Sequence, residues 1–256
     1  MDRRRFLQTT LALGALAAAP RRAFGIGPAQ DLHVSRIRYD GNWSVHAGAG
    51  STWAEEVGMR TSVDVSPQEE TLGFEDRRFA ERPFAFLAGD RDFALRDGEQ
   101  EALRRWLELG GLLFIDNAGQ AEPSEAFDRA VRRELARLFP KEPLSRISPE
   151  HVLYRSFYRL DYPAGRAIRK PWAEGLAIGR RYGVILSHND VLGALAREPG
   201  GRFAATPTPG GESQREMAMR FAVNVVMYAM CLHYKDDQVH LDYLLHNRKW
   251  KIRRPE

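Results

Sequence analysis

Three short polar segments carry the residues of this sequence that are best suited to chemistry. They are Gly89-Asp90-Arg91-Asp92, Asp116-Asn117-Ala118-Gly119-Gln120 and Ser187-His188-Asn189-Asp190, and each follows an apolar run. Their carboxylates, imidazole and amides suit a small polar ligand or a weakly held hard cation. The spacing of the oxygen ligands is too loose to predict a metal site, so we expect no metal and no cofactor. The candidate binding residues are Asp90, Asp92, Asp116, Asn117, His188, Asn189 and Asp190.

The same residue types also have a purely structural interpretation. Asp and Asn end strands and begin helices because their side chains bond nearby backbone N–H groups. His188 is a candidate acid or base, but a single histidine in a loop is often only structural. We favour convergence of the segments on a ligand over the structural interpretation, for binding and not for catalysis. Asn117 and Asn189 add hydrogen-bond donors that the end of a strand does not require.

The stretch from Arg82 to Gln120 predicts the elements that position two of these segments. Residues 83–88 and 112–115 are short apolar runs without alternation, as expected of strands buried on both faces. Between them lies a helix that is capped by Asp97 and carries Trp106 on its buried face. Such a βαβ unit belongs to a parallel sheet, and ligands bind beyond the carboxyl ends of its strands. We expect the core of the sheet to contain Phe84, Phe86, Leu113, Phe114 and Ile115, with Trp106 packed over them.

The remaining segments extend this α/β pattern. Further strands are predicted at residues 33–39, 62–65, 176–178 and 182–186, the last two as a hairpin around residues 179–181. Further helices are predicted at residues 53–59, 124–138 and 213–234, and residues 151–160 are ambiguous between helix and strand. The single cysteine, Cys231, lies in an apolar helical run and excludes an intramolecular disulfide.

Charge is distributed unevenly along the 256 residues. The chain has 38 basic and 34 acidic residues, and residues 1–25 hold the whole excess. The remainder is neutral and shows no electrostatic footprint for nucleic acid. Residues 235–256 form a polar tail with a basic end, which we interpret as a solvated end in preference to a contact with a membrane or a partner.

The N-terminus resembles a twin-arginine export signal. The resemblance rests on Arg3, Arg4, Phe6 and Leu7, which precede an apolar stretch of about eleven residues, too short to span a membrane. We therefore expect residues 1–25 to be a signal peptide, the protein to be periplasmic, and the mature chain to have no stable transmembrane span. If the signal is not cleaved, it would tether the domain to the inner membrane.

Successive blocks of residues 32–234 resemble the bacterial domain of unknown function 4159 family. The blocks are RPFAFLAGDRDFAL, EALRRWLELGGLLFIDNAG, AFDRAVRRELARLFP, LSRISPEHVLYRSFYRL and GVILSHNDVLGAL. The family is similar in fold to class I glutamine amidotransferases and to flavodoxin-like proteins. This resemblance implies an α/β three-layer sandwich with a mostly parallel central sheet, and it implies no activity.

The first function to consider is that of an amidotransferase. Its mechanism needs a cysteine in a strand–helix elbow and a histidine–acid pair. Cys231 has no such elbow, and the chain has no G-x-S-x-G, dinucleotide-binding or phosphate-binding motif. We therefore expect a non-catalytic ligand-binding or assembly module of the cell envelope, with an envelope protein or a small polar ligand as its partner. The alternative is an enzyme that acts on a small polar or carbohydrate substrate through the aspartates and His188.

Overall fold

The computed structural model describes residues 31–119 and 122–247. The strands are β1 Ser35–Ile37, β2 Glu70–Leu72, β3 Phe84–Gly89, β4 Leu112–Asn117, β5 Ser145–Arg146, β6 Glu174–Ile178 and β7 Arg181–Ser187. The helices are α2 Ala49–Arg60, α3 Arg77–Ala80, α4 Asp97–Glu108, α5 Glu122–Leu138, the 3₁₀ helix η1 Val152–Arg155, α6 Val191–Leu195 and α7 Gly211–Asn247. The predictions for the export signal, Gln120 and the basic end of the tail lie outside the described residues, as does the side chain of Cys231.

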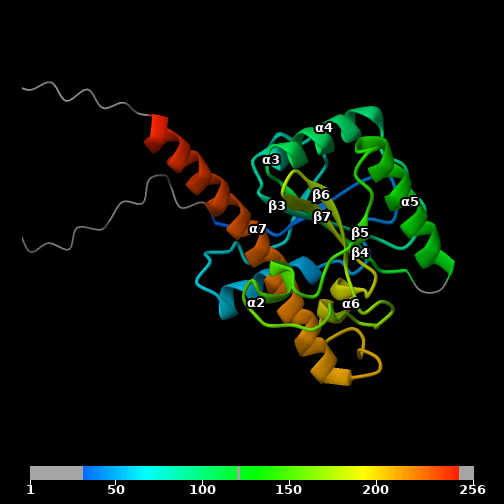
Figure 1. The fold of residues 1–256 in the computed structure, drawn as a ribbon. Helices are drawn as coiled ribbons and strands as arrows, with labels where there is room; N and C mark the ends of the chain where they lie inside the picture. The colour runs from blue at the N-terminus through cyan, green and yellow to red at the C-terminus, as the bar shows by residue number, and fades with distance from the viewer. Residues whose placement is uncertain (1–30, 120–121, 248–256) are drawn as a thin grey trace, which may run out of the picture. The chain divides into compact units, whose positions relative to one another are not determined.

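The seven described strands form one sheet in the order β2-β1-β3-β4-β7-β6-β5. The first five of these are mutually parallel, and β6 runs antiparallel to both β7 and β5. The predicted βαβ unit is confirmed as β3-α4-β4, and the predicted hairpin is confirmed as β6-β7. The fold is therefore α/β with a mostly parallel mixed sheet, whose carboxyl edge collects the ends of β1, β3, β4 and β7 (Figure 1).

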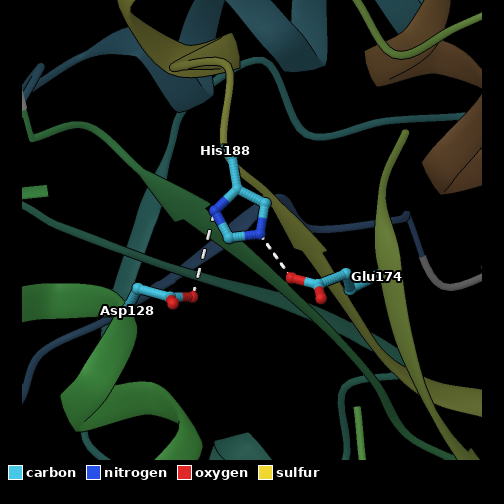
Figure 2. A group of neighbouring side chains, drawn as sticks. All are labelled: Asp128, Glu174 and His188. Carbon is cyan, nitrogen blue, oxygen red and sulfur yellow. Dashed lines mark hydrogen bonds and ion pairs between the residues drawn. The ribbon is translucent and has the colours of Figure 1, made fainter. Parts of the chain in front are cut away.

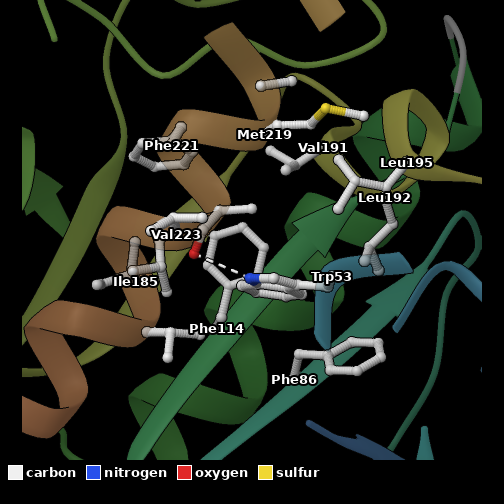
Figure 3. Close-up of a cluster of buried hydrophobic side chains, with 14 of the residues drawn as sticks. Trp53, Phe86, Phe114, Ile185, Val191, Leu192, Leu195, Met219, Phe221 and Val223 are labelled. Atoms are coloured by element: carbon white, nitrogen blue, oxygen red, sulfur yellow. Dashed lines mark hydrogen bonds between the residues drawn. The ribbon is translucent and has the colours of Figure 1, made fainter. Parts of the chain in front are cut away.

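Helices cover both faces of the sheet because strand side chains alternate between the faces. One core lies between the sheet and α2, α6 and α7, and its centre is Trp53 (Figure 3). The Trp53 ring lies 5.2–5.7 Å from the rings of Phe84, Phe86 and Phe114, and its Nε1–H donates to the Ala222 carbonyl at 2.9 Å. A tryptophan at this depth needs such a partner for its single polar atom.

A second core lies between the other face of the sheet and helices α4 and α5. Trp106 is buried there against Phe79, and its Nε1–H donates to the Arg82 carbonyl at 2.7 Å. The apolar side chains along one face of α5 are buried in the same core, together with Leu113 and Ile115 of β4. Every core residue predicted for the central sheet is buried, so the prediction from continuous apolar runs is confirmed. The prediction that Trp106 packs over all of them is wrong, because Phe84, Phe86 and Phe114 lie in the core of Trp53 on the other face.

The termini of several elements differ from the sequence prediction. The N-cap of α4 is Arg96 and not Asp97. The Glu99 carboxylate accepts a hydrogen bond from the backbone N–H of Arg96 at 2.9 Å. Helix α2 begins at Ala49, four residues before the predicted start at residue 53. The segment 62–65 forms only an isolated bridge at Val65, and the edge strand is β2 instead.

Strand β4 extends through Asn117, so two of the predicted loop residues are strand residues. Helix α7 begins at Gly211 and continues to Asn247, thirteen residues beyond its predicted end. Among the described residues, no helix is both long and apolar enough to cross a bilayer.

Candidate functional site

The three polar segments meet at the carboxyl edge of the sheet. Ala88 of β3 pairs with Asp116 of β4, which in turn pairs with Ser187 of β7. Alternation along the strands then divides the side chains between the two faces. Asp116 lies on the face of α6, whereas His188 lies on the face of α5. The residues predicted as one site therefore belong to two sites that share an edge.

The site on the α6 face is a cleft of about 470 Å³, which we call the His46 cleft. Its lining residues come from the loops after β1, β3 and β4, from helix α6, and from the segments before β6 and after α6. They are Val45, His46, Asp90, Ala118, Gly119, Arg166, Gly193, Ala204 and Ala205. The cleft thus occupies the place where parallel sheets of this kind bind their ligands.

A histidine–aspartate pair forms one wall of the His46 cleft. Nε2 of His46 lies 2.9 Å from Oδ1 of Asp190, whose side chain is fully buried. Both residues have left-handed backbones, with φ of 53° at His46 and 57° at Asp190. This conformation is costly for residues other than glycine and persists only where the surroundings enforce it. Asp190 also caps α6, accepting from the Gly193 N–H at 3.1 Å, and pairs with Arg166.

The loop that carries His46 is held by a buried arginine, Arg36 of β1. Its guanidinium donates to the carbonyls of Trp43, Val45 and His46 at 2.9–3.1 Å. Its charge is paired with Glu69 at 2.5 Å. Because a guanidinium has five donors in a fixed plane, this one side chain fixes the path of the loop and the position of His46.

Electrostatics in the wall favour a charged His46. Burial opposes the imidazolium, but the hydrogen bond to Asp190 and the charges of Asp190 and Asp116 outweigh it, so the pKa of His46 is raised. For Asp190, burial is outweighed by the partners His46 and Arg166, and its pKa is lowered. The imidazolium form of His46 is therefore favoured in this wall, and in that form the ring can donate a hydrogen bond to a ligand.

Asp116 lies behind this wall and does not line the cleft. Its two carboxylate oxygens accept the backbone N–H groups of Val191 and Leu192 at 3.0 and 2.7 Å, in the first turn of α6. Complete burial and the neighbouring charge of Asp190 outweigh these bonds and raise the pKa of Asp116 to about 7. Its role is to hold α6 against β4. The structural interpretation of the sequence predicted bonds to nearby N–H groups of the same turn, whereas these groups lie 75 and 76 positions away along the chain.

The opposite wall contains Asp90, the first residue after β3. Its Oδ1 accepts a hydrogen bond from Nδ2 of Asn42 at 2.8 Å, and Arg91 lies 3.6 Å away. Asp90 and Arg166 therefore add one carboxylate and one guanidinium to the lining of the cleft. Formal charges around the cleft are close to balanced, because His46 and Arg166 face Asp90 and Asp190.

The site on the α5 face is a hollow of about 330 Å³, which we call the His188 hollow. Its lining residues are Asn117, Glu125, Asp128, Arg129, Lys170 and His188. The buried His188 ring lies between Glu174 of β6, whose Oε2 is 2.5 Å from Nε2, and Asp128 of α5, whose Oδ1 is 3.9 Å from Nδ1 (Figure 2). The hydrogen bond to His188 outweighs burial and, with Arg132 and Lys170, lowers the pKa of Glu174 to about 2.

Two of the predicted residues join neither site. Asp92 is exposed and pairs with Arg133 at 3.1 Å. Asn189 is fully buried, and its side chain bonds only backbone groups among the described residues, namely the carbonyls of Pro163 and Lys170 and the N–H groups of Arg169 and Lys170.

Several residues of both sites were not predicted from the sequence. His46 and Arg166 lie in irregular segments whose composition gives no signal. Asp128 occurs among the charged residues of an amphipathic helix. Glu174 lies two residues before the predicted strand 176–178, and in the structure it pairs with Leu186, two residues before His188. A β-bulge between Leu176 and Ala177 shifts this register, so the predicted hairpin alone did not give the pairing.

Comparison with known proteins agrees with the resemblance seen in the sequence. The domain of unknown function (DUF4159) family matches residues 33–230, which include every element of the two sites. No curated protein matches the chain. Because the match covers more than three quarters of its 256 residues, the chain belongs to the domain of unknown function (DUF4159) family.

Proposed function

We propose that this chain is a non-catalytic domain that binds a small polar ligand in the His46 cleft. The observation that carries the proposal is the His46–Asp190 pair in the wall of a 470 Å³ cleft, made by two residues with left-handed backbones. A buried arginine, Arg36, enforces the same geometry from behind. Strain that is enforced by a buried network and exposed in a cleft is typical of a binding site.

The charges of the cleft indicate the class of ligand. His46 and Arg166 supply donors with positive charge, and Asp90 supplies an acceptor with negative charge. Because these charges nearly cancel, a ligand of high net charge would lose more hydration than the cleft returns. We infer a neutral or zwitterionic ligand rich in hydrogen-bonding groups, such as a sugar or an amino acid.

Saturation-transfer-difference NMR tests this proposal with a mixture of glucose, N-acetylglucosamine, alanine and glutamate. We expect the full chain to give signals from at least one neutral or zwitterionic probe, and His46→Gln to abolish them. His33→Gln is the matched control, because His33 lies outside the cleft and the variant should bind as the wild type does. Equal signals from the wild type and His46→Gln, or none from the wild type, would contradict the proposal.

The second candidate function is an enzyme, and the observation that favours it is again the His46–Asp190 hydrogen bond. A histidine oriented by a buried aspartate is the base-and-orienter half of many catalytic sites. No serine, threonine or cysteine is among the residues that line the cleft, so His46 would act on a bound substrate or water. Conversion of a probe that binds, followed by NMR over hours and lost in His46→Gln, would favour the enzyme. His188, the acid or base predicted from the sequence, lies on the other face.

We further propose that the domain functions in the periplasm. Residues 1–25 would be the twin-arginine signal, residues 32–234 the domain and residues 235–256 the tail. The finer likeness to flavodoxin-like proteins and amidotransferases is part of the same proposal. It is supported by five parallel strands, by helices on both faces and by a cleft at the carboxyl edge.

A further inference from the structure

The His188 hollow contains an arrangement that the binding of a ligand in the His46 cleft does not use. His188 is 96% buried, and its two ring nitrogens face two carboxylates from different elements (Figure 2). Glu174, Asp128 and His188 each place a potential ligand atom within 4.8 Å of the other two. Two further features decide which ligand this group can bind. They are the position of the proton on the His188 ring and the hydrogen bonding of one carboxylate oxygen of Asp128.

The contact between Nε2 of His188 and Oε2 of Glu174 is 2.5 Å and needs a proton between the two atoms. The carboxylate is an acceptor only, so Nε2 carries that proton. Nζ of Lys170 lies 3.1 Å from Nε2 and 3.6 Å from Oε2. Because Nε2 carries that proton, it cannot also accept a hydrogen bond from Lys170, whose ammonium is the second cation beside Glu174. In the neutral ring, Nδ1 is then an acceptor.

Nδ1 faces Oδ1 of Asp128 at 3.9 Å, so two acceptors point at each other when the ring is neutral. That oxygen is buried, and within the part of the chain that the structure describes it receives no hydrogen bond. The other oxygen, Oδ2, accepts from Nε of Arg132 at 2.9 Å. A buried acceptor without a partner is costly, and a cation placed between the two acceptors would remove that cost.

We propose that the His188 hollow binds a divalent transition-metal ion through Nδ1 of His188 and Oδ1 of Asp128, with Glu174 orienting the imidazole. A metal-bound histidine commonly donates its other N–H to a carboxylate, which fixes the tautomer and the ring. Zinc bonds of about 2.0–2.2 Å at a tetrahedral angle place two ligand atoms about 3.4 Å apart, so binding must draw Nδ1 and Oδ1 together by about 0.5 Å.

The remaining coordination positions face the hollow. Glu125 lines it one helical turn before Asp128, and we infer that its carboxylate is the third protein ligand. A set of one imidazole and two carboxylates is typical of zinc and of its neighbours in the first transition row. The sequence predicted no metal because these ligands come from α5 and the end of β7, and no local spacing connects them.

The charged residues around the His188 hollow limit its affinity for a metal ion, and they provide a test that distinguishes a metal ion from an anion. Glu174 and Asp128 are balanced by Arg132 and Lys170, so the group is close to neutral before an ion binds. Lys170 is the cation that lines the hollow beside the ring, and it repels an incoming metal ion. Lys170→Met should therefore tighten metal binding, whereas it would weaken the binding of an anion at the same place.

Isothermal titration of the full, chelator-stripped chain with Zn²⁺ tests the site, and the visible absorption of Co²⁺ reports its coordination. We expect one equivalent in the wild type that is lost in His188→Gln, weakened at least about tenfold in Asp128→Asn and tightened in Lys170→Met. His33→Gln is the matched control and should bind as the wild type does. Circular dichroism verifies folding, and Asp128→Asn provides a second variant because it keeps the shape of a partly exposed side chain.

Three results would overturn the proposal. One is a wild type that binds no Zn²⁺. Another is unchanged stoichiometry in both His188→Gln and Asp128→Asn, which would place the ion elsewhere, for example at His233, His240 and His246 near the end of the chain. The third is weaker binding in Lys170→Met. None of them affects the proposed role of the His46 cleft, which is tested by His46→Gln.

Discussion

Replacing Asp116 by asparagine should stabilise this protein at alkaline pH. Asp116 is fully buried between β4 and α6, and its ionised form gains two backbone N–H bonds there. Burial and the charge of Asp190 cost more than those bonds return, which is why the pKa of Asp116 is raised. Asparagine cannot ionise, so it avoids that cost, but its Nδ2 group is a donor and cannot accept the second backbone N–H bond.

The magnitude follows from the difference between the two states. The carboxyl has an ordinary pKa of 3.8 and a pKa of about 7 in the folded protein. A shift of about 3 units corresponds to about 4 kcal/mol. Because the folded pKa is the higher one, this contribution to stability is complete below about pH 4 and is lost as the pH rises through about 7. Because the loss of one buried N–H bond costs about 1–3 kcal/mol, the variant should be less stable than the wild type by that amount near pH 4. At pH 8 the gain of about 4 kcal/mol outweighs this cost, and the variant should be more stable by about 1–3 kcal/mol.

Urea denaturation, followed by tryptophan fluorescence at several pH values between about 4.5 and 8, measures this difference. Asp92→Asn is the matched control, because Asp92 comes from the same set of predicted residues but is exposed. It should change the free energy of unfolding by less than about 0.5 kcal/mol at every pH. The reasoning is refuted if Asp116→Asn is less stable than the wild type at pH 8. It is also refuted if the difference between the two proteins does not change with pH.

Three other substitutions have definite expected outcomes. Trp106→Ala should lower the free energy of unfolding by about 3–5 kcal/mol in urea melts, and a loss below about 1 kcal/mol would contradict its burial. Arg36→Met should cost about 3–5 kcal/mol, because it leaves three carbonyls without their donor and the Glu69 carboxylate without its cation. The His46 NMR signals should then broaden, and sharp, unshifted signals would show that Arg36 does not hold the loop. Replacing Arg3 and Arg4 by lysine should leave the protein uncleaved in the cytoplasm, and normal periplasmic accumulation on fractionation would contradict the export proposal.

The central strands could be predicted because a strand buried on both faces leaves a continuous apolar run. Phe84 to Ala88 and Leu112 to Ile115 are such runs, and both lie in the middle of the sheet. Strand β2 could not be predicted in this way. It is three residues long at the edge of the sheet, and its first residue, Glu70, binds Arg78 and Arg82. An edge strand with a charged, solvated side has no composition that separates it from a loop.

Convergence of the polar segments was also predictable, but their division between two faces was missed. The ends of parallel strands must meet at one edge, so Asp90, Asp116 and His188 lie at the same edge. Treating Asp116 and Asn117 as loop residues discarded the alternation that separates them. Once β4 is extended through Asn117, consecutive side chains point to opposite faces, and the same alternation separates Ser187 from His188.

Neither site could be completed from the sequence, because the completing residues depend on tertiary structure. His46 reaches Asp190 across 144 positions of the chain, and its place is fixed by Arg36, a buried cation within a strand. A single-sequence pattern does not predict such a cation, since a charged residue in a strand is normally assigned to a solvated face.

Asn189 connects the two sites, although it lines neither of them. Its side-chain oxygen accepts the N–H groups of Arg169 and Lys170, and its amide donates to the carbonyls of Pro163 and Lys170. These bonds hold segment 163–170 against the end of β7. The segment gives Arg166 to the His46 cleft and Lys170 to the His188 hollow, while the neighbours of Asn189 in sequence give Asp190 and His188 to the same two sites. One buried amide therefore helps to position charged groups on both faces of the sheet.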